Sequence, residues 1–161
     1  MGMDIYDFTI WPVGDAYRQL LRIVSANSEM VGFVIRPGEA RFSEPAKRLL
    51  ADLERDLITA EQVWSWPGSE MSSSSRPYEH RLYRCIPRVV SLLEVASSSF
   101  GDWVSPGLPE DLHFLRSDKS VVLGSIGHER FVWMKLSADE ASRMRRELPS
   151  TLEGSLRRRR P

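Results

Sequence analysis

The sequence predicts a single α+β domain, with a mostly antiparallel sheet and helices packed on one face of it. Strand-like and helix-like segments alternate over the first hundred or so residues, and the last third contains three short strand-like runs joined by turns. Hairpins combined with helices are typical of α+β folds. With 161 residues, 42% of them hydrophobic, the chain has the size of one ordinary domain and can bury a sizeable core. We therefore expect one domain over residues 3–149.

The spacing of apolar residues places the elements of the first half. Alternating apolar residues indicate strands, and apolar residues three or four positions apart indicate helices. The expected segments are a strand over residues 4–11, a helix over 15–26, a strand over 30–38 and a helix over 44–57. Asp15 and Ser43 are the expected N-caps of the two helices, and Leu57 is the last apolar residue of the second helix.

The second half contains a different mixture of elements. The expected segments are strands around Trp64 and Trp66 and over residues 78–85, a helix over 87–97, three strands between 111 and 137, and a helix over 138–147. The last helix begins with a capping box, in which Ser137 and Glu140 each bond the backbone N–H of the other. Residues 69–77 are rich in serine and predict a mobile surface loop. Residues 150–161 lose the periodicity and end near four arginines, which predicts a disordered basic tail.

Charge and composition argue against several classes of protein. Lys plus Arg equals Asp plus Glu at 22 each, so no global field attracts nucleic acid or an anionic membrane. Nucleic acid is expected to make at most weak contact through Arg157, Arg158, Arg159 and Arg160. No apolar run approaches the length of a membrane span, and the first residues carry no secretion or lipidation signal. The single cysteine, Cys85, is expected to be a buried, inert thiol, and we expect a cytoplasmic protein.

One stretch, residues 125–136, places His128 and Glu129 side by side between two strand-like runs. The pair fits neither a zinc-binding H-E-x-x-H motif nor a nucleophile elbow. Because neighbouring strand residues point to opposite faces, the two side chains converge on a substrate only if the turn rotates them together. We interpret the pair as the exposed corner of a hairpin. The alternative is proton transfer by His128, with Glu129 or Asp111 as its orienting partner.

The sequence predicts no metal and no cofactor. His80, His113 and His128 are isolated from one another in the chain, so their spacing does not favour a metal site. Glycine-rich phosphate-binding motifs do not occur in the sequence. Asp102, Glu110 and Asp111 lie in a segment with two prolines and two glycines, where caps and turn hydrogen bonds are the expected role and an acid–base pair is the alternative.

Five tryptophans are many for a domain of this size. Burial is the expected default, because large apolar side chains stabilise a core most per residue. Trp64 and Trp66 share one face of the expected strand, so both are buried or both are exposed, and exposed they form an interaction patch. With the polar positions above, the candidate binding residues are Trp64, Trp66, Trp103, Glu110, Asp111, His128 and Glu129.

Residues 100–141 contain a Trp and a Pro, then Leu-Pro-Glu-Asp-Leu, an aromatic strand, a hairpin, Ser-Ile-Gly-His-Glu and a Ser-capped helix. This pattern resembles one in small uncharacterised bacterial proteins, and the resemblance extends over residues 83–148. Some proteins of this kind resemble immunity proteins, which bind and neutralise a partner toxin. The resemblance implies a protein partner and assigns no catalytic role to His128 or Glu129.

Two functions of different classes follow. The first is a protein-binding module, most concretely an immunity-like inhibitor of a partner toxin. The second is a small hydrolase-like enzyme with His128 as its general base. Because the sequence contains no complete catalytic constellation, binding is the favoured function. The near-neutral charge argues against an inhibitor of a basic nuclease, which prefers an acidic face.

Overall fold

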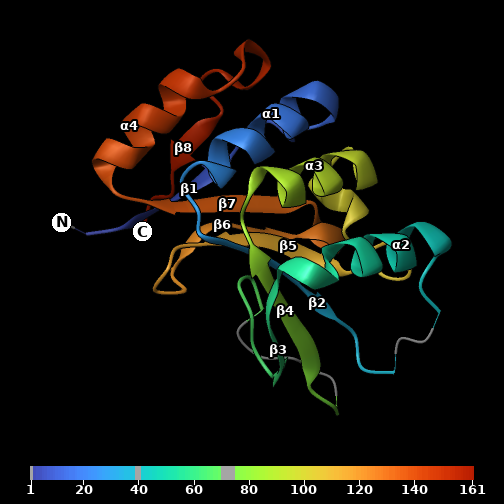
Figure 1. The fold of residues 1–161 in the computed structure, drawn as a ribbon. Helices are drawn as coiled ribbons and strands as arrows, with labels where there is room; N and C mark the ends of the chain where they lie inside the picture. The colour runs from blue at the N-terminus through green and yellow to red at the C-terminus, as the bar shows by residue number, and fades with distance from the viewer. Residues whose placement is uncertain (1, 39–40, 70–74) are drawn as a thin grey trace.

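The computed structural model describes residues 2–38, 41–69 and 75–161, which form one sheet and a layer of helices (Figure 1). The strands are β1 (Asp4–Phe8), β2 (Met30–Ile35), β3 (Leu57–Val63), β4 (Tyr78–Arg84), β5 (Glu110–Leu115), β6 (Val121–Ile126), β7 (Phe131–Leu136) and β8 (Leu156–Arg158). The helices are α1 (Gly14–Ser25), α2 (Glu44–Leu53), α3 (Pro87–Ala96) and α4 (Ala138–Glu147). The short 3-10 turns are η1 (Glu54–Asp56), η2 (Phe100–Asp102), η3 (Gly127–Glu129) and η4 (Ser150–Leu152).

The described strands pair antiparallel in the order β3-β4-β2-β5-β6-β7-β1-β8. The α+β fold with an antiparallel sheet is therefore confirmed. The serine-rich segment expected to be a mobile loop falls largely on residues 70–74, which lie outside the described residues.

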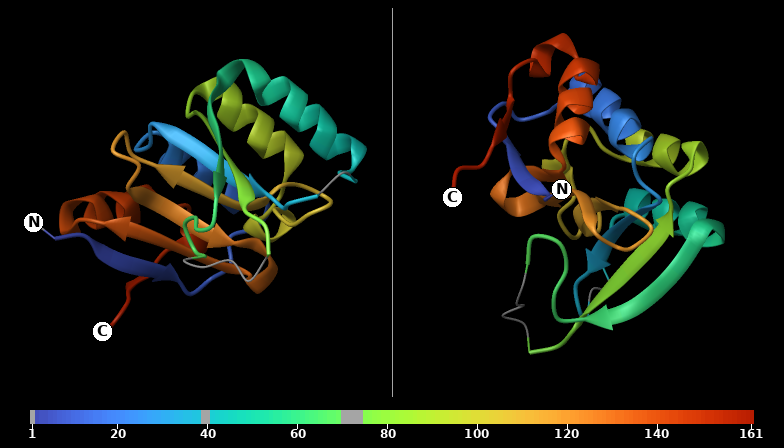
Figure 2. Two further views of the ribbon diagram at one scale, coloured as in Figure 1. Left: turned by 90° about the horizontal axis from the view of Figure 1, so that it is seen from below. Right: turned by 90° about the vertical axis from the view of Figure 1, so that its left-hand side faces the viewer.

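The four helices lie on one side of the sheet, and both chain ends lie near β1 and β8 (Figure 1, Figure 2). The apolar stripe of each helix faces the sheet and forms one large core with it. The helices contribute, among others, Leu20 and Leu21 from α1, Leu49 and Leu53 from α2, Val89 and Leu93 from α3, and Ala141 and Met144 from α4. A smaller apolar cluster of Met30, Leu82 and Leu115 packs on the opposite face of the sheet.

The last third forms the expected meander, because β5, β6 and β7 are consecutive neighbours in the sheet. Lys119 (φ 66°) and Arg130 (φ 53°) adopt left-handed backbone conformations at the two turns, without a glycine at either position. The capping box of α4 is also confirmed. Ser137 Oγ accepts from the backbone N–H of Glu140 at 3.2 Å, and the Glu140 carboxylate accepts from the backbone N–H of Ser137 at 2.7 Å.

Two helix boundaries differ from the prediction. The helix expected over residues 44–57 ends at Leu53, and Leu57 begins β3 instead, where it lies opposite Tyr83 of β4. The intervening turn η1 consists of charged residues, so the apolar spacing of the helix does not continue through it. Val13 rather than Asp15 is the N-cap of α1, and Asp15 lies in the first turn, where its charge suits the helix dipole.

The prediction of a disordered tail over residues 150–161 is wrong. Leu152 and Leu156 are buried, and β8 pairs with β1 at the edge of the sheet. Ion pairs fix the strand further: Arg158 with Asp4 at 2.9 Å and Arg159 with Asp7 at 2.6 Å. A three-residue strand is too short to produce a detectable apolar period. The folded domain therefore continues beyond residue 149, and removal of residues 150–161 is expected to destabilise it.

The turn that follows β3 packs over the sheet face opposite the helices. The backbones of Trp66 and Ser69 exchange two hydrogen bonds of 2.9 Å each. Gly68 approaches the sheet so closely that an added Cβ atom lies 2.6 Å from the ring of Trp133. The ring of Trp133 lies on this face because its neighbour Val132 points into the main core. This packing brings the indole of Trp66 next to β5.

Candidate functional site

A polar pocket of about 430 Å³ lies beside the start of β5. Five of the candidate binding residues line it: Trp66, Glu110, Asp111, His128 and Glu129. Arg36 and Tyr78 also line it, and neither was among the predicted residues. Arg36 directly follows β2, and Tyr78 begins β4. Both residues come close to the start of β5 because the strands are neighbours in the order β4-β2-β5. A single sequence does not specify this order, so no local pattern points to the two residues.

Asp111 lines the polar pocket because of a bulge in β5. Val34 lies opposite Glu110 and Gly32 lies opposite His113, so β5 has one residue more than β2 over this stretch. Asp111 occupies the irregularity with φ 60°, in the left-handed region. The bulge rotates the chain, and the neighbours Glu110 and Asp111 therefore both reach the pocket, whereas a regular strand points them to opposite faces. Backbone strain of this kind is concentrated at functional sites.

The carboxylate of Asp111 is buried and is held by two N–H donors. Trp66 Nε1 donates to Oδ2 at 2.8 Å, and the backbone N–H of Gly127 donates to Oδ1 at 3.0 Å. Burial raises the pKa of the Asp111 carboxyl, and the two hydrogen bonds only partly oppose this effect. Within residues 2–38, 41–69 and 75–161, no cationic side chain forms an ion pair with Asp111. Among these residues its negative charge therefore has two hydrogen-bond donors but no ion-pair partner.

The other wall of the polar pocket combines an ion pair with an aromatic stack. Arg36 Nη2 donates to Glu110 Oε1 at 2.6 Å. The rings of Trp66 and Tyr78 stack with their centroids 4.5 Å apart. Burial raises the pKa of the Tyr78 hydroxyl, and the nearby charge of Glu110 raises it further. The pocket therefore has an aromatic wall and a negative interior.

His128 and Glu129 lie in η3, at the rim of the polar pocket, where they form the exposed hairpin corner that the sequence predicted. Their side chains are 65% and 59% exposed, and His128 Nε2 lies 3.7 Å from Glu129 Oε1. In the described part of the chain no hydroxyl or thiol is hydrogen bonded to His128. Among the described residues no hydrogen bond joins Asp111 to the imidazole, and the two Asp111 oxygens accept from Trp66 and Gly127.

The three tryptophans predicted to bind a partner occupy different environments. β3 ends before Trp64, so Trp64 and Trp66 do not share a strand face as predicted: Trp64 is 53% exposed, whereas Trp66 is half-buried in the pocket wall. The prediction of Trp103 as a binding residue is wrong. It is fully buried in the core, stacks on Phe33, and donates from Nε1 to Tyr17 Oη at 2.9 Å.

Two of the three histidines, which the sequence keeps far apart, meet across the central strand β2. His80 Nε2 and His113 Nε2 are 2.8 Å apart, and His113 Nδ1 lies 2.7 Å from the carbonyl oxygen of Asp111, to which it donates. Gly32 of β2 permits this approach, because an added Cβ atom lies 3.0 Å from His113 Nε2. Burial and, to a smaller extent, the neighbouring His80 lower the pKa of His113 to about 3. Among the described residues no group of three or more His, Cys, Asp or Glu is arranged to hold a metal ion.

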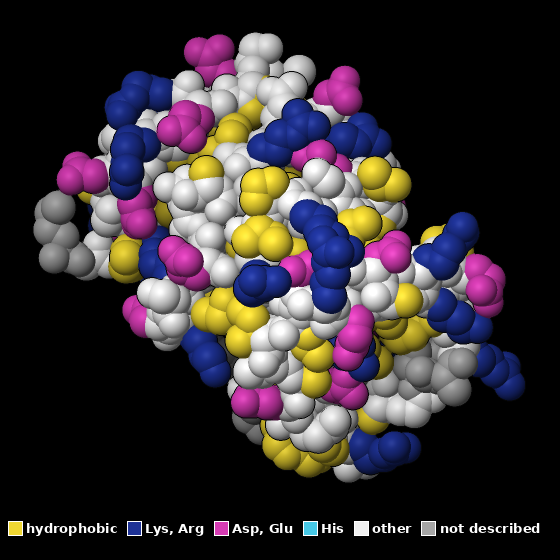
Figure 3. Space-filling view, in the orientation of Figure 1, with side chains coloured by type: hydrophobic (Ala, Val, Ile, Leu, Met, Phe, Trp, Pro, Cys, Tyr) yellow, Lys and Arg dark blue, Asp and Glu magenta, His cyan; other side chains and the backbone are white. Residues whose placement is uncertain are grey.

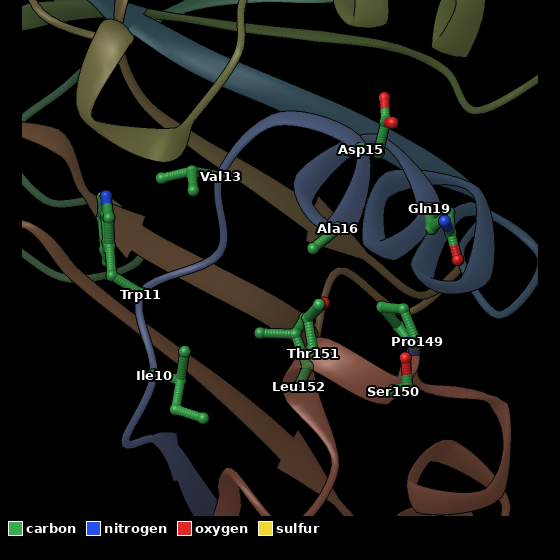
Figure 4. A pocket seen from close by; sticks show the side chains of 10 residues that line it. All are labelled: Ile10, Trp11, Val13, Asp15, Ala16, Gln19, Pro149, Ser150, Thr151 and Leu152. Carbon is green, nitrogen blue, oxygen red and sulfur yellow. The ribbon is translucent and has the colours of Figure 1, made fainter.

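A second hollow, of about 430 Å³, lies between the start of α1 and the turn after α4 (Figure 4). Ile10, Trp11 and Val13 face it on one side, and Pro149 and Leu152 face it on the other. Asp15 is the one ionisable side chain among the described residues that line it. The hollow therefore offers one carboxylate and no second ionisable group among the described residues that line it.

Basic and acidic side chains are intermixed over the face of the molecule seen in Figure 3. This face presents no field of a single sign to steer a polyanion. None of the helices in the described residues combines the length and the apolar character that crossing a membrane requires. Cys85 is half-buried, and burial raises the pKa of its thiol to about 12, so the thiol is unreactive at neutral pH.

Comparison of the chain with protein-family models, with curated proteins and with solved structures finds no match. The resemblance of residues 83–148 to small bacterial proteins therefore stays a prediction. A functional proposal has to come from the geometry and charge of the polar pocket.

Proposed function

We propose that this protein is a binding module for another protein, with the polar pocket and the nearby exposed Trp64 as its contact surface. The observation that carries the proposal is the internal bonding of the pocket: Trp66 fixes Asp111, and Arg36 fixes Glu110. Side chains held in this way form a preformed surface, which lowers the entropy lost on binding. Trp64 adds an exposed aromatic side chain of the kind common in binding hot spots.

The surroundings of His128 support binding over proton transfer. A general base needs a proton donor within hydrogen-bond reach and is commonly oriented by a third group. His128 has an exposed side chain whose closest charged partner is its own neighbour Glu129, at 3.7 Å. A side chain in this position suits the rim of an interface, where polar groups are solvent-accessible.

The most concrete form of the proposal is an immunity-like inhibitor of a partner toxin in a bacterial cytoplasm. It comes from the resemblance of residues 83–148, a segment that also supplies Glu110, Asp111, His128 and Glu129 to the polar pocket. The resembling segment and the proposed contact surface therefore overlap. We expect the partner to contact the pocket side of the molecule rather than the helix layer.

Affinity capture with the wild-type protein, mass spectrometry and a titration with the purified partner test the proposal. Trp64→Ala and the charge reversal Glu129→Lys are each expected to weaken binding about tenfold or more. Val95→Ser on α3 and Glu44→Lys on α2 are the matched controls, because these side chains are also exposed but lie in the helix layer. We expect both controls to bind like the wild type.

A substrate screen distinguishes the enzymatic alternative. Wild-type protein and His128→Ala are incubated with ester, amide and phosphodiester substrates under the same conditions. The binding proposal predicts no turnover by either protein. Turnover by the wild type that disappears in His128→Ala would contradict it and identify His128 as a general base.

A further inference from the structure

We propose that the polar pocket receives an arginine side chain of the partner protein. This inference rests on the proposed binding function and specifies the chemistry that the partner presents. Among the described residues that line the pocket, three carboxylates, those of Glu110, Asp111 and Glu129, face one permanently charged cation, Arg36. The pocket therefore carries a net negative charge, which a bound cation neutralises.

Asp111 has the hydrogen-bonding capacity to bind a guanidinium. A carboxylate offers four lone-pair sites on its two oxygens, and Asp111 uses one site on each oxygen for Trp66 and Gly127. One site on each oxygen remains for an incoming donor. A guanidinium presents two parallel N–H groups, which match the two oxygens of one carboxylate.

The pocket favours arginine over lysine for a second reason. The stacked rings of Trp66 and Tyr78 line the pocket, and a guanidinium is planar, weakly hydrated and able to stack on aromatic faces. A lysine ammonium is a compact, strongly hydrated charge and loses more hydration in such a place. A pocket of about 430 Å³ also admits a whole arginine side chain, whose methylene groups can pack against Ile126.

The charges of the pocket give each carboxylate a different part in the interaction. Glu110 is already paired with Arg36, so it keeps that cation at one wall. Glu129 is exposed at the rim, where it attracts the approaching cation with a salt-dependent effect on the association rate. Asp111, which lacks a counter-charge among the described residues, is the group that the bound guanidinium neutralises.

An NMR titration with N-acetyl-L-arginine methylamide tests the proposal without knowledge of the partner. The reporters are the indole N–H of Trp66, assigned with the Trp66→Phe variant, and the backbone amide of Gly127, because both bond Asp111. We expect saturable shifts of both signals. N-acetyl-L-citrulline methylamide has nearly the same shape without the charge, and we expect it to bind at least about tenfold more weakly.

Two variants and one control keep the test specific. Asp111→Asn is expected to weaken the arginine probe about tenfold, and Glu129→Gln, at an exposed position that does not endanger folding, about twofold to threefold. Glu44→Gln on α2 is the matched control and is expected to bind the probe like the wild type. Equal affinity for the citrulline probe, or no shift of the two reporters in the folded wild type, would overturn the proposal. Tighter binding of N-acetyl-L-lysine methylamide would also overturn it.

Failure of the arginine inference can be distinguished from failure of the proposed binding function. If the arginine probe does not bind but a purified partner binds and is lost with Glu129→Lys, the binding function stands and the arginine inference fails. If the probe binds and the substrate screen reveals turnover that depends on His128, the ligand class stands and the binding function fails.

Discussion

Asp56 and Asp111 are both buried aspartates, 2% and 4% exposed, but among the described residues only Asp56 forms ion pairs. Asp56 is surrounded by guanidinium groups: Arg84 at 2.7 Å, Arg55 at 3.7 Å, and Arg88, which also donates to it. Asp111 accepts only uncharged N–H groups within the part of the chain that the structure describes. The contrast teaches that burial alone does not distinguish a structural carboxylate from a candidate binding group.

The location of each carboxylate matches its environment. Asp56 lies in η1 and joins β4 to α3, because Arg84 belongs to β4 and Arg88 to α3. Its interactions are complete within the fold, so it stabilises the structure. Asp111 lies on a bulge, in a strained conformation, beside a pocket that opens to solvent. Asp111 lines this pocket, and Trp66 and Gly127 each occupy one acceptor site of its carboxylate.

The largest expected effect is on the structural carboxylate. Asp56→Ala removes the charge-assisted hydrogen bonds from Arg84 and Arg88 and is expected to lower the free energy of unfolding by about 2 kcal/mol, because the guanidinium groups left behind are partly solvated. Urea denaturation at neutral pH measures this. Asp15→Ala is the matched control, because its side chain is 93% exposed and its ion pair with Arg18 contributes about 0.5 kcal/mol or less. Equal effects of the two substitutions would remove the distinction between the two kinds of carboxylate.

Acid is expected to destabilise the protein through His113, which bonds the backbone of Asp111. Its pKa is about 3 in the folded state and 6.5 in the unfolded state, so between these values the unfolded state binds the extra proton. Stability therefore falls as the pH drops below 6.5, by about 1.4 kcal/mol per pH unit. The lowered pKa of His80 adds a contribution of the same sign.

Thermal or urea unfolding between pH 7 and pH 4 measures this slope. His113→Gln removes the titrating group, so its stability is expected to depend less on pH in this range, whatever its stability at pH 7. His128→Ala is the control and is expected to keep the wild-type slope, because it leaves the contact between His80 and His113 intact. The same slope in the wild type and in His113→Gln would show that another group is responsible.

Asp111→Asn is expected to have a smaller effect on stability than on binding. Asn has an NH2 group in place of one carboxylate oxygen, so one of the two hydrogen bonds, from Trp66 or from Gly127, is lost. We expect this loss to lower the free energy of unfolding by about 1 kcal/mol at neutral pH. The pH dependence of the unfolding free energy reports on the charge of Asp111. Because the folded pKa of Asp111 is raised, wild-type stability falls as the pH rises from 3.8 through that raised value, and the variant lacks this component. Parallel curves for the two proteins would contradict the raised pKa.

The smallest effect is expected at the rim. His128→Ala removes an exposed contact between sequence neighbours and is expected to change the free energy of unfolding by about 0.5 kcal/mol or less. Chemical denaturation measures it. A loss of about 2 kcal/mol would show that the hairpin corner has a structural role that its exposure does not suggest.

The parts of the fold that the sequence predicts are those with a local signal. The helices follow from apolar spacing and, at Ser43 and Ser137, from side-chain caps that the structure confirms. The meander follows from three short strand-like runs with turns between them. The tail strand β8 has only three residues, and its stability comes from Leu156 and from ion pairs to β1, which no local period reveals.

The polar pocket is only partly predictable, for the same reason. His128 and Glu129 stand out because a polar pair between strands is a local signal. The pairing of His80 with His113 and the arrival of Arg36 depend on β4, β2 and β5 being neighbours, which is a property of the whole sheet. The bulge at Asp111 depends on register with β2, so the sequence suggests the carboxylate but not its orientation.

The most direct test of the account is a carbon-13 NMR titration of the Asp111 carboxyl, with and without N-acetyl-L-arginine methylamide. We expect a pKa above the ordinary value of 3.8 in the free protein, because burial disfavours the charged form. We also expect that saturating probe lowers this pKa, because a bound guanidinium favours the ionised form. A pKa at or below 3.8 that the arginine probe leaves unchanged would show that Asp111 is not the carboxylate that binds a cation in the polar pocket.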